Sequence, residues 1–300
     1  MMPQTPMSTH TSGLGPTGTV AEPITWRLHR EVVLLAGWGR AILLQLAHPL
    51  VAQGVADHSG FAESPRGRVT RLRRTLGAML ALTFGTPDEA AHAADAINRI
   101  HDRVNGHLAE PAGGLAAGAR YSAHDPALLA WVHATLVDTF LITYERFVAP
   151  LTPADRDRYC REAGAAAPLL GIPDEMLPRT ADALAAYMER MLAGDQIVVT
   201  GTARRLAREV LSLGLPPIAR PFTAAARLPA VGLLPGNIRD AYGLPWTPWH
   251  ERALAVMAAT ARRGLPLLPT SLRVWPAARR AAALSSREPN RISRTGKRPC

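Results

Sequence analysis

Lysine is almost missing from this sequence of 300 residues, in which Lys297 is the one lysine among 34 basic residues. The others are arginines, whose guanidinium groups stay protonated and do not act as nucleophiles or metal ligands. The chain before Lys297 therefore cannot supply a Schiff-base lysine or the lysine that a phosphate-binding loop of the P-loop type needs.

Cysteine is also scarce, because Cys160 and Cys300 are the only two in the chain. Two cysteines cannot build a disulfide framework or a thiolate metal site, and they suit a reducing compartment. The first residues lack the basic-then-apolar pattern of a signal peptide, so we read 1–20 as a flexible N-terminal lead. These observations predict a cytoplasmic protein.

Aromatic residues make up 5% of the chain, and none follows Trp275. The arginine-rich segment 276–300 supplies most of the formal net charge of +10, yet it offers no ring on which a base could stack. We expect this segment to be a basic disordered tail and expect no nucleic-acid partner.

Strand signals are nearly absent, whereas apolar residues recur at helical spacing along most of the chain. A proline follows each of Thr86, Asp125 and Thr152, and acidic residues also follow Thr86 and Thr152, as is typical of helix starts. The sequence predicts an all-α fold, a single-domain multi-helix bundle over 21–275. The expected helices are 26–53, 66–84, 87–108, 126–147, 153–166, 180–192, 200–213 and 248–263.

The most apolar run, at 31–56, is interrupted by Arg40, Gln45 and His48. Its uninterrupted parts are too short to cross a bilayer, so we interpret it as a core helix that bends at His48–Pro49. Peripheral membrane contact stays open as the alternative.

One histidine, His101, falls on the apolar stripe of the helix expected at 87–108, together with Ala94 and Ile97. A buried imidazole needs a partner, since leaving it unpaired costs about 1–3 kcal/mol. It is either a core histidine bonded to a carbonyl or hydroxyl group, or an axial ligand of haem iron. On the same helix, Glu89 and His92 form an E-x-x-H pair of the kind found in di-iron bundles, but they face solvent and have no second pair.

Three further histidines stand in unusual surroundings: His48 before a proline, His58 after Asp57, and His133 beside an apolar helix face. Each can be structural, but together they favour a polar cluster inside the bundle.

The basic helix at 66–84 places Arg71 and Thr75 one turn apart, with Arg74 beside them. This is either a solvated basic face or a site that pairs with an anion.

Taken in order, "GRAILLQLAHPLVAQGVADHS", "RLRRTLGAMLALTFG", "IHDRVNG", "YSAHDPALLAWVHATLVDTFL" and "LLGIPDEMLP" resemble the oxygenase MpaB and rubber oxygenase (latex-clearing protein) family over about 25–260. The resemblance implies an all-helical protein that encloses haem b and uses dioxygen on a small hydrophobic substrate, such as an isoprenoid or another alkene.

The resemblance also assigns roles to residues of this chain. It makes His101 the metal ligand of the haem, with His48, His58 and His133 as further candidates for cofactor binding. Arg71, Arg74 and Thr75 match the element on the dioxygen-binding side and become the candidate catalytic residues. Arg74 stands where rubber oxygenases carry a lysine that can ligate iron, which arginine cannot do, so cleavage of rubber itself is in doubt.

Three alternatives remain from the sequence: a haem-binding protein without oxygenase activity, a cofactor-free helical binding protein and a di-iron bundle. The oligomeric state stays open.

Overall fold

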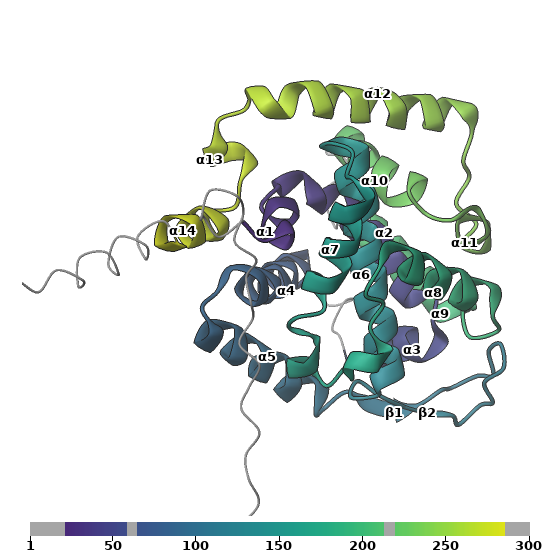
Figure 1. The fold of residues 1–300 in the computed structure, drawn as a ribbon. Coiled ribbons are helices and arrows are strands. Elements are labelled where there is room, and N and C mark those ends of the chain that lie inside the picture. The colour runs from purple at the N-terminus through teal and green to yellow at the C-terminus, as the bar shows by residue number, and fades with distance from the viewer. Residues whose placement is uncertain (1–21, 59–64, 213–219, 286–300) are drawn as a thin grey trace, which may run out of the picture.

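The computed structural model describes residues 22–58, 65–212 and 220–285, and these form an all-α fold in which the one sheet has two short strands (Figure 1). This confirms the predicted fold class. In chain order the elements are α1 (Ile24–His29), η1 (Val32–Leu34), α2 (Leu35–Leu46), α3 (Pro49–His58), α4 (Pro65–Phe84), α5 (Pro87–His101), β1 (Asn105–His107), β2 (Arg120–Ser122), α6 (Pro126–Phe147), α7 (Pro153–Ala163), η2 (Ala167–Leu170), η3 (Asp174–Met176), α8 (Ala181–Ala193), α9 (Gly201–Ser212), α10 (Arg220–Gly232), α11 (Gly236–Ala241), α12 (Pro248–Gly264), η5 (Leu265–Leu267), α13 (Thr270–Arg273) and α14 (Pro276–Ser285).

Helix α6 runs through the middle of the molecule and packs against α2 (Figure 1). Its Trp131 and Phe147 are almost fully buried. The two helices cross closely at Gly37, where an added Cβ would lie 2.1 Å from Oγ1 of Thr143. This crossing is the centre of the main hydrophobic core, and α8, α9 and α10 contribute buried residues around it.

The predicted helix starts are confirmed. Thr86 and Glu89 form a capping box at α5, since Oγ1 of Thr86 accepts the N–H of Glu89 at 3.2 Å. Asp125 accepts the N–H of Ala127 at 2.8 Å, and Thr152 accepts the N–H of Asp155 at 3.1 Å. Each cap pairs an N–H that the helix itself leaves unbonded.

The single helix expected at 26–53 is broken into several elements. The chain turns after His29, and the helical segments 32–46 and 49–58 meet at 105°. Pro49 has no N–H and disfavours a helical conformation at His48, so the expected bend becomes a sharp corner. The run contains Leu43 and Leu44, which are fully buried, as expected for a core helix.

The helix expected at 87–108 ends at His101 instead. The residues after it form β1, which pairs antiparallel with β2 through Gly106 and Tyr121. Val104 and Leu108 are therefore not on the helical stripe of His101. A strand of three residues leaves too little periodicity in the sequence to be predicted.

The tail predicted at 276–300 also begins too early, because Pro276–Ser285 forms α14. Its Ala278 and Ala281 are buried against Phe84 of α4. The N-terminal lead at 1–20 and the remainder of the tail, 286–300, lie outside the described residues.

The chain just before α14 is tied to the start of the fold. Glu31 is 1% exposed, and Arg273 donates to both of its carboxylate oxygens at 2.7 and 2.8 Å. The backbone N–H of Trp275 donates to the carbonyl of Arg30 at 3.1 Å. Residues more than two hundred positions apart thus share one ion pair and one backbone bridge.

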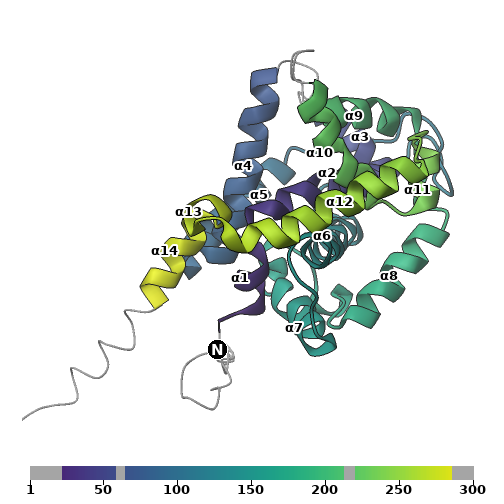
Figure 2. The same cartoon turned by 90° about the horizontal axis from the view of Figure 1, so that it is seen from above.

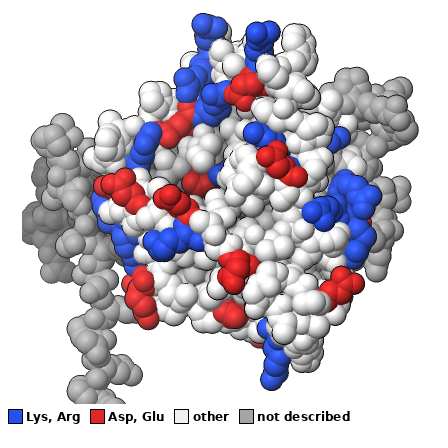
Figure 3. All heavy atoms as spheres, turned by 90° about the vertical axis from the view of Figure 1, so that its right-hand side faces the viewer, with Lys and Arg blue, Asp and Glu red and all other residues white. Residues whose placement is uncertain are grey.

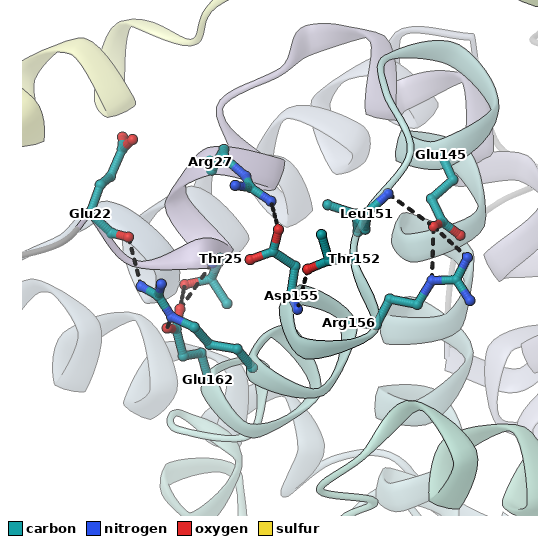
Figure 4. A network of polar contacts seen from close by, with 10 residues as sticks. Glu22, Thr25, Arg27, Glu145, Leu151, Thr152, Asp155, Arg156 and Glu162 are labelled. Atoms are coloured by element: carbon teal, nitrogen blue, oxygen red, sulfur yellow. Dashed lines mark hydrogen bonds and ion pairs between the residues drawn. The ribbon is translucent and has the colours of Figure 1, made fainter. Parts of the chain in front are cut away.

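Polar contacts join α7 to α1 and α6 (Figure 4). Arg27 points at Asp155 with a distance of 2.8 Å, and Nε of Arg156 donates to Glu145 at 2.9 Å. These pairs hold α7 against the body, and Tyr159 of α7 is buried in the main core.

One helix in the described part, Pro126–Phe147, is long and apolar enough to cross a membrane, and 67% of its apolar window is buried inside the protein. The bent pair α2–α3 passes the same test only if its two halves are joined. On the face shown in Figure 3, acidic and basic side chains are interspersed, and basic side chains project from the upper edge, where α12 runs in Figure 1.

Candidate histidine site

His101 is the last residue of α5, and its ring is half-buried. Its Nδ1 is buried and has no hydrogen-bond partner among the described residues. Burial first, and then the nearby His124, lower the pKa of His101, while Asp102 acts in the opposite direction. The imidazole is therefore neutral near pH 7, the state in which histidine binds metal ions.

A second imidazole, that of His124, lies against His101. The ring centroids are 5.8 Å apart and the rings are nearly perpendicular, at 81°. Nε2 of His124 is 2.8 Å from Oδ1 of Asp102, which follows His101 directly. The sequence does not single out His124, because it stands directly before Asp125 and Pro126, which indicate only the start of a helix.

His58 lies at the end of α3, against the strand that follows His101. Its Nε2 is 3.0 Å from the carbonyl oxygen of Asn105 and 3.2 Å from the hydroxyl of Tyr121. That hydroxyl donates to Asp57 at 2.6 Å, and burial together with this bond raises the pKa of Tyr121. The structure thus brings His58 to the segment next to His101, in a hydrogen-bonded network of its own.

His48 is buried at the corner between α2 and α3. Its Nδ1 accepts the N–H of Leu50 at 3.3 Å, so it supports the start of α3. Burial lowers the pKa of His48 to about 4, with a smaller opposing effect of Asp125. The neutral ring thus accepts a backbone N–H, that of Leu50, which the corner at Pro49 leaves without a helical partner.

His133 of α6 serves the junction with α7. Its Nε2 lies 3.1 Å from the carbonyl oxygen of Ala163, while Nδ1 is buried and has no partner in the part of the chain that the structure describes. Burial lowers the pKa of His133. Among the described residues, no hydrogen bond or ring contact joins His133 or His48 to His101, so the structure does not bring the four predicted histidines into one cluster.

The predicted catalytic residues Arg71, Arg74 and Thr75 all lie on α4, which contacts α5 and is joined to it by residues 85–86. Arg74 and Thr75 are exposed, and the side chain of Arg71 lies outside the described part. Apolar residues on the same helix, such as Leu76 and Met79, are only half-buried. Helix α4 therefore leaves apolar surface uncovered beside its basic residues.

The E-x-x-H pair has another role. Glu89 accepts the N–H of Thr86 at 2.9 Å as part of the capping box, and His92 is exposed as predicted. No group of three His, Cys, Asp or Glu side chains within residues 22–58, 65–212 and 220–285 is placed to hold a metal ion.

Two surface hollows lie away from His101. One is lined by residues of α9 and α10 and of the segment that follows α11, with Arg208, Leu211 and Tyr242 among them. The other lies between α6 and α12 and is lined by Arg146, Arg262 and Arg263 with three alanines.

The donor set at His101 fits a group that needs one protein ligand. A neutral imidazole with an unpaired nitrogen, at a helix end beside uncovered apolar surface, has the chemistry of an axial ligand to a large flat cofactor. It does not supply the several carboxylate and imidazole ligands that a bare metal ion needs.

The described residues thus combine an all-helical fold with a half-buried, neutral histidine at the end of α5 whose Nδ1 has no hydrogen-bond partner among them. The model of the catalytic domain of the ER-bound oxygenase mpaB/B'/rubber oxygenase family matches residues 26–263, and the chain belongs to this family. No curated protein and no solved structure matches the chain. As a member of an oxygenase family it is an enzyme that uses dioxygen and a substrate, and α13 and α14 lie beyond the matched region.

Proposed function

We propose that the protein is a haem b-dependent oxygenase of a small hydrophobic substrate, such as an isoprenoid or another alkene, and that it works in the cytoplasm. Membership of the oxygenase family supports the reaction class. The observation that carries the haem proposal is the buried, partnerless nitrogen of His101 on a ring kept neutral by its surroundings.

His101 would hold the iron, and the haem would supply the centre at which dioxygen is activated. The neutral ring needs no proton removed before it binds a metal, because its lowered pKa leaves it unprotonated. His124 lies edge-on to His101 and is itself tied to Asp102, so the pair limits how far the His101 ring can rotate.

Residues of α4 would act opposite His101. Arg74 is always protonated and exposed, and it can stabilise negative charge that develops on oxygen. Thr75 offers a hydroxyl that donates or accepts a hydrogen bond. Arg74 cannot ligate iron, so no side chain at this position closes the site in the way a lysine would.

The half-buried apolar residues of α4 support a hydrophobic substrate. Leu76, Met79 and Leu80 carry no hydrogen-bonding groups that would orient a polar molecule. Apolar surface of this kind favours an alkene chain, which is bound by exclusion of water.

The first test is an absorption spectrum of the protein purified with haem supplied, in the oxidised and reduced forms. We expect a Soret band that is lost in His101→Ala and kept in His92→Ala, a matched control on the exposed face of the same helix. A wild-type protein without the band, or a band unchanged in His101→Ala, contradicts the proposal.

The second test is oxygen uptake by the haem-loaded protein with isoprenoid alkenes. We expect uptake that falls about 10²- to 10³-fold in Arg74→Ala if Arg74 stabilises developing charge. A protein that shows the Soret band but no uptake with any alkene is a haem-binding protein without oxygenase activity.

A further inference from the structure

The C-terminal part of the described chain exposes an unusual amount of apolar surface. Six of the eight large apolar side chains that are exposed in the described residues lie between positions 249 and 284. They are Trp249, Val256, Leu267, Leu268, Leu272 and Leu284. Trp249 is 73% exposed and Leu267 is 83% exposed. Single exposed apolar residues are ordinary on a soluble protein, but a concentration of them in one segment marks a contact surface.

Helix α12 carries part of this surface on one face. At about 100° per residue, a single stripe collects side chains at positions spaced by three or four. This stripe contains Trp249, Arg252, Val256, Thr260 and Arg263, all of them exposed. Leu254 and Ala258, on the opposite side, are buried against the body. Because α12 lies on the outside of the molecule (Figures 1 and 2), the stripe faces solvent.

The outer side of the segment 248–285 carries positive charge. Residues 248–285 contain six arginines, of which Arg273 is paired with Glu31, and one acidic residue, Glu251. Glu251 is 57% exposed but lies off the outer stripe, where it accepts the Nε1–H of Trp246 at 3.0 Å and pairs with Arg146 at 3.4 Å. The outer stripe of α12 is therefore apolar and positive, with no carboxylate.

The hollow between α6 and α12 extends the positive surface. It has a volume of about 280 Å³ and is lined by Arg146, Arg262 and Arg263 with Ala255, Ala258 and Ala259. Nε of Arg146, one of the lining residues, is buried and has no hydrogen-bond partner among the described residues, although the same guanidinium also contacts Glu251. Several arginines around a small hollow suit a phosphate group.

We propose that this surface docks on a lipid bilayer with anionic headgroups. The surface comprises the outer stripe of α12 and the segment from η5 to α13 with Leu267, Leu268 and Leu272, and we call it the α12 face. Tryptophan favours the interface between headgroups and acyl chains, leucines enter the acyl boundary, and arginines pair with lipid phosphates. The inference does not depend on the proposed oxygenase function.

Charge argues for a bilayer over a second copy of the chain. A two-fold contact places the same patch of both copies together, so two stripes that carry Arg252 and Arg263 and no carboxylate would face each other. An anionic membrane supplies the negative charge that the α12 face lacks.

The test is sedimentation of the full chain with vesicles of phosphatidylcholine, with and without phosphatidylglycerol, at low and high salt. We expect binding to the anionic vesicles that weakens as salt rises. Arg252→Gln together with Arg263→Gln should lower the affinity by about fivefold per arginine. Trp249→Ala together with Leu267→Ser should release the protein from the same vesicles, and all four residues are exposed, so the fold is retained.

The matched controls are Arg190→Gln on α8 and Leu169→Ser on η2, both exposed and outside the α12 face, which should bind as the wild type does. Absence of binding to anionic vesicles at low salt overturns the proposal, as does equal binding by the α12-face variants. A dimer that forms without lipid and dissociates in those variants would show that the face meets another copy instead.

Discussion

The crossing of α2 and α6 and the arm formed by α4 and α5 are packed very differently. At the crossing, Gly37 lets two helices approach until an added Cβ would touch Thr143, and Arg40 is buried with its charge paired. In the arm, Ala94 is the one buried residue of α5, and Phe84 is the one buried among the described side chains of α4. The fold therefore combines a tightly packed frame with a lightly covered arm.

The candidate site residues lie in the less tightly packed of these two regions, the α4–α5 arm. His101, Arg74 and Thr75 all belong to the arm. Segments with few buried apolar contacts open at a lower free energy than the core does. A cofactor or an apolar substrate can enter such a region without disturbing the α2–α6 frame.

The largest effect should come from removing a charge at the frame. Arg40 is 3% exposed and donates to Asp138 at 2.7 Å, to Thr139 at 2.6 Å and to the carbonyl of Leu233 at 2.6 Å. Arg40→Ala leaves Asp138 unpaired in a largely buried position, and we expect a loss of about 3–5 kcal/mol in the free energy of unfolding measured in urea.

The matched control is Arg156→Ala, which breaks an ion pair with Glu145 at a side chain that is 45% exposed. An exposed pair should contribute less than about 1 kcal/mol. Equal losses in the two variants would show that Arg40 is not a buried, paired charge.

A smaller loss should follow Gly37→Ala in the same frame. The new methyl group would overlap Oγ1 of Thr143, so α2 and α6 must separate. We expect the free energy of unfolding to fall by about 1–3 kcal/mol. The combined change of Gly37→Ala and Thr143→Ala, measured in the same urea titration, should restore part of this loss if the contact is its cause.

Acid should weaken the frame through two histidines whose pKa values burial lowers. The pKa of His29, beside Tyr159 and Thr83, and that of His48 are both about 4. Below the unfolded-state value of about 6.5, the unfolded chain takes up protons that the folded chain does not. The free energy of unfolding is therefore highest, with respect to these two groups, above that pH. It falls toward pH 4 by up to about 1.4 kcal/mol per pH unit for each histidine.

The variant His29→Gln isolates one of these two groups. Between about pH 6.5 and 4, it should reduce the slope of the unfolding free energy against pH by the contribution of the one proton that His29 takes up on unfolding. The measurement is urea unfolding at a series of pH values. An unchanged slope would assign the acid sensitivity to His48 and other groups.

The smallest expected effect has the opposite sign and lies in the arm. Gly77 of α4 has no atom within 4 Å of an added Cβ. Gly77→Ala should therefore raise stability by up to about 1 kcal/mol through helix propensity alone, measured by thermal unfolding. A loss comparable to that of Gly37→Ala would mean that α4 is packed as tightly as the frame.

Local chemistry made much of this fold predictable. Thr86, Asp125 and Thr152 precede prolines, and each begins a helix where the sequence indicates one. The bend at Pro49 was also expected, but its angle of 105° depends on how α3 packs against distant α9. No single stretch of sequence contains that information.

The candidate site was only partly predictable for the same reason. Helical periodicity separated His92, which is exposed, from His101, which is half-buried. It could not show that Ile100 would be 46% exposed, because that depends on which elements pack against α5 after folding. Nor could it show that His124 meets His101, since that contact exists only after β1 and β2 have paired.

The ion pair between Glu31 and Arg273 has a consequence for the order of synthesis. Glu31 is made early, but the guanidinium that binds both of its carboxylate oxygens is 242 residues further along the chain. While the protein is still on the ribosome, Glu31 can pair with its neighbour Arg30, which lies 3.6 Å away in the folded protein, but it lacks the guanidinium that binds both of its oxygens. Final consolidation of the N-terminal helices must therefore wait for a segment that lies past the domain shared with the family.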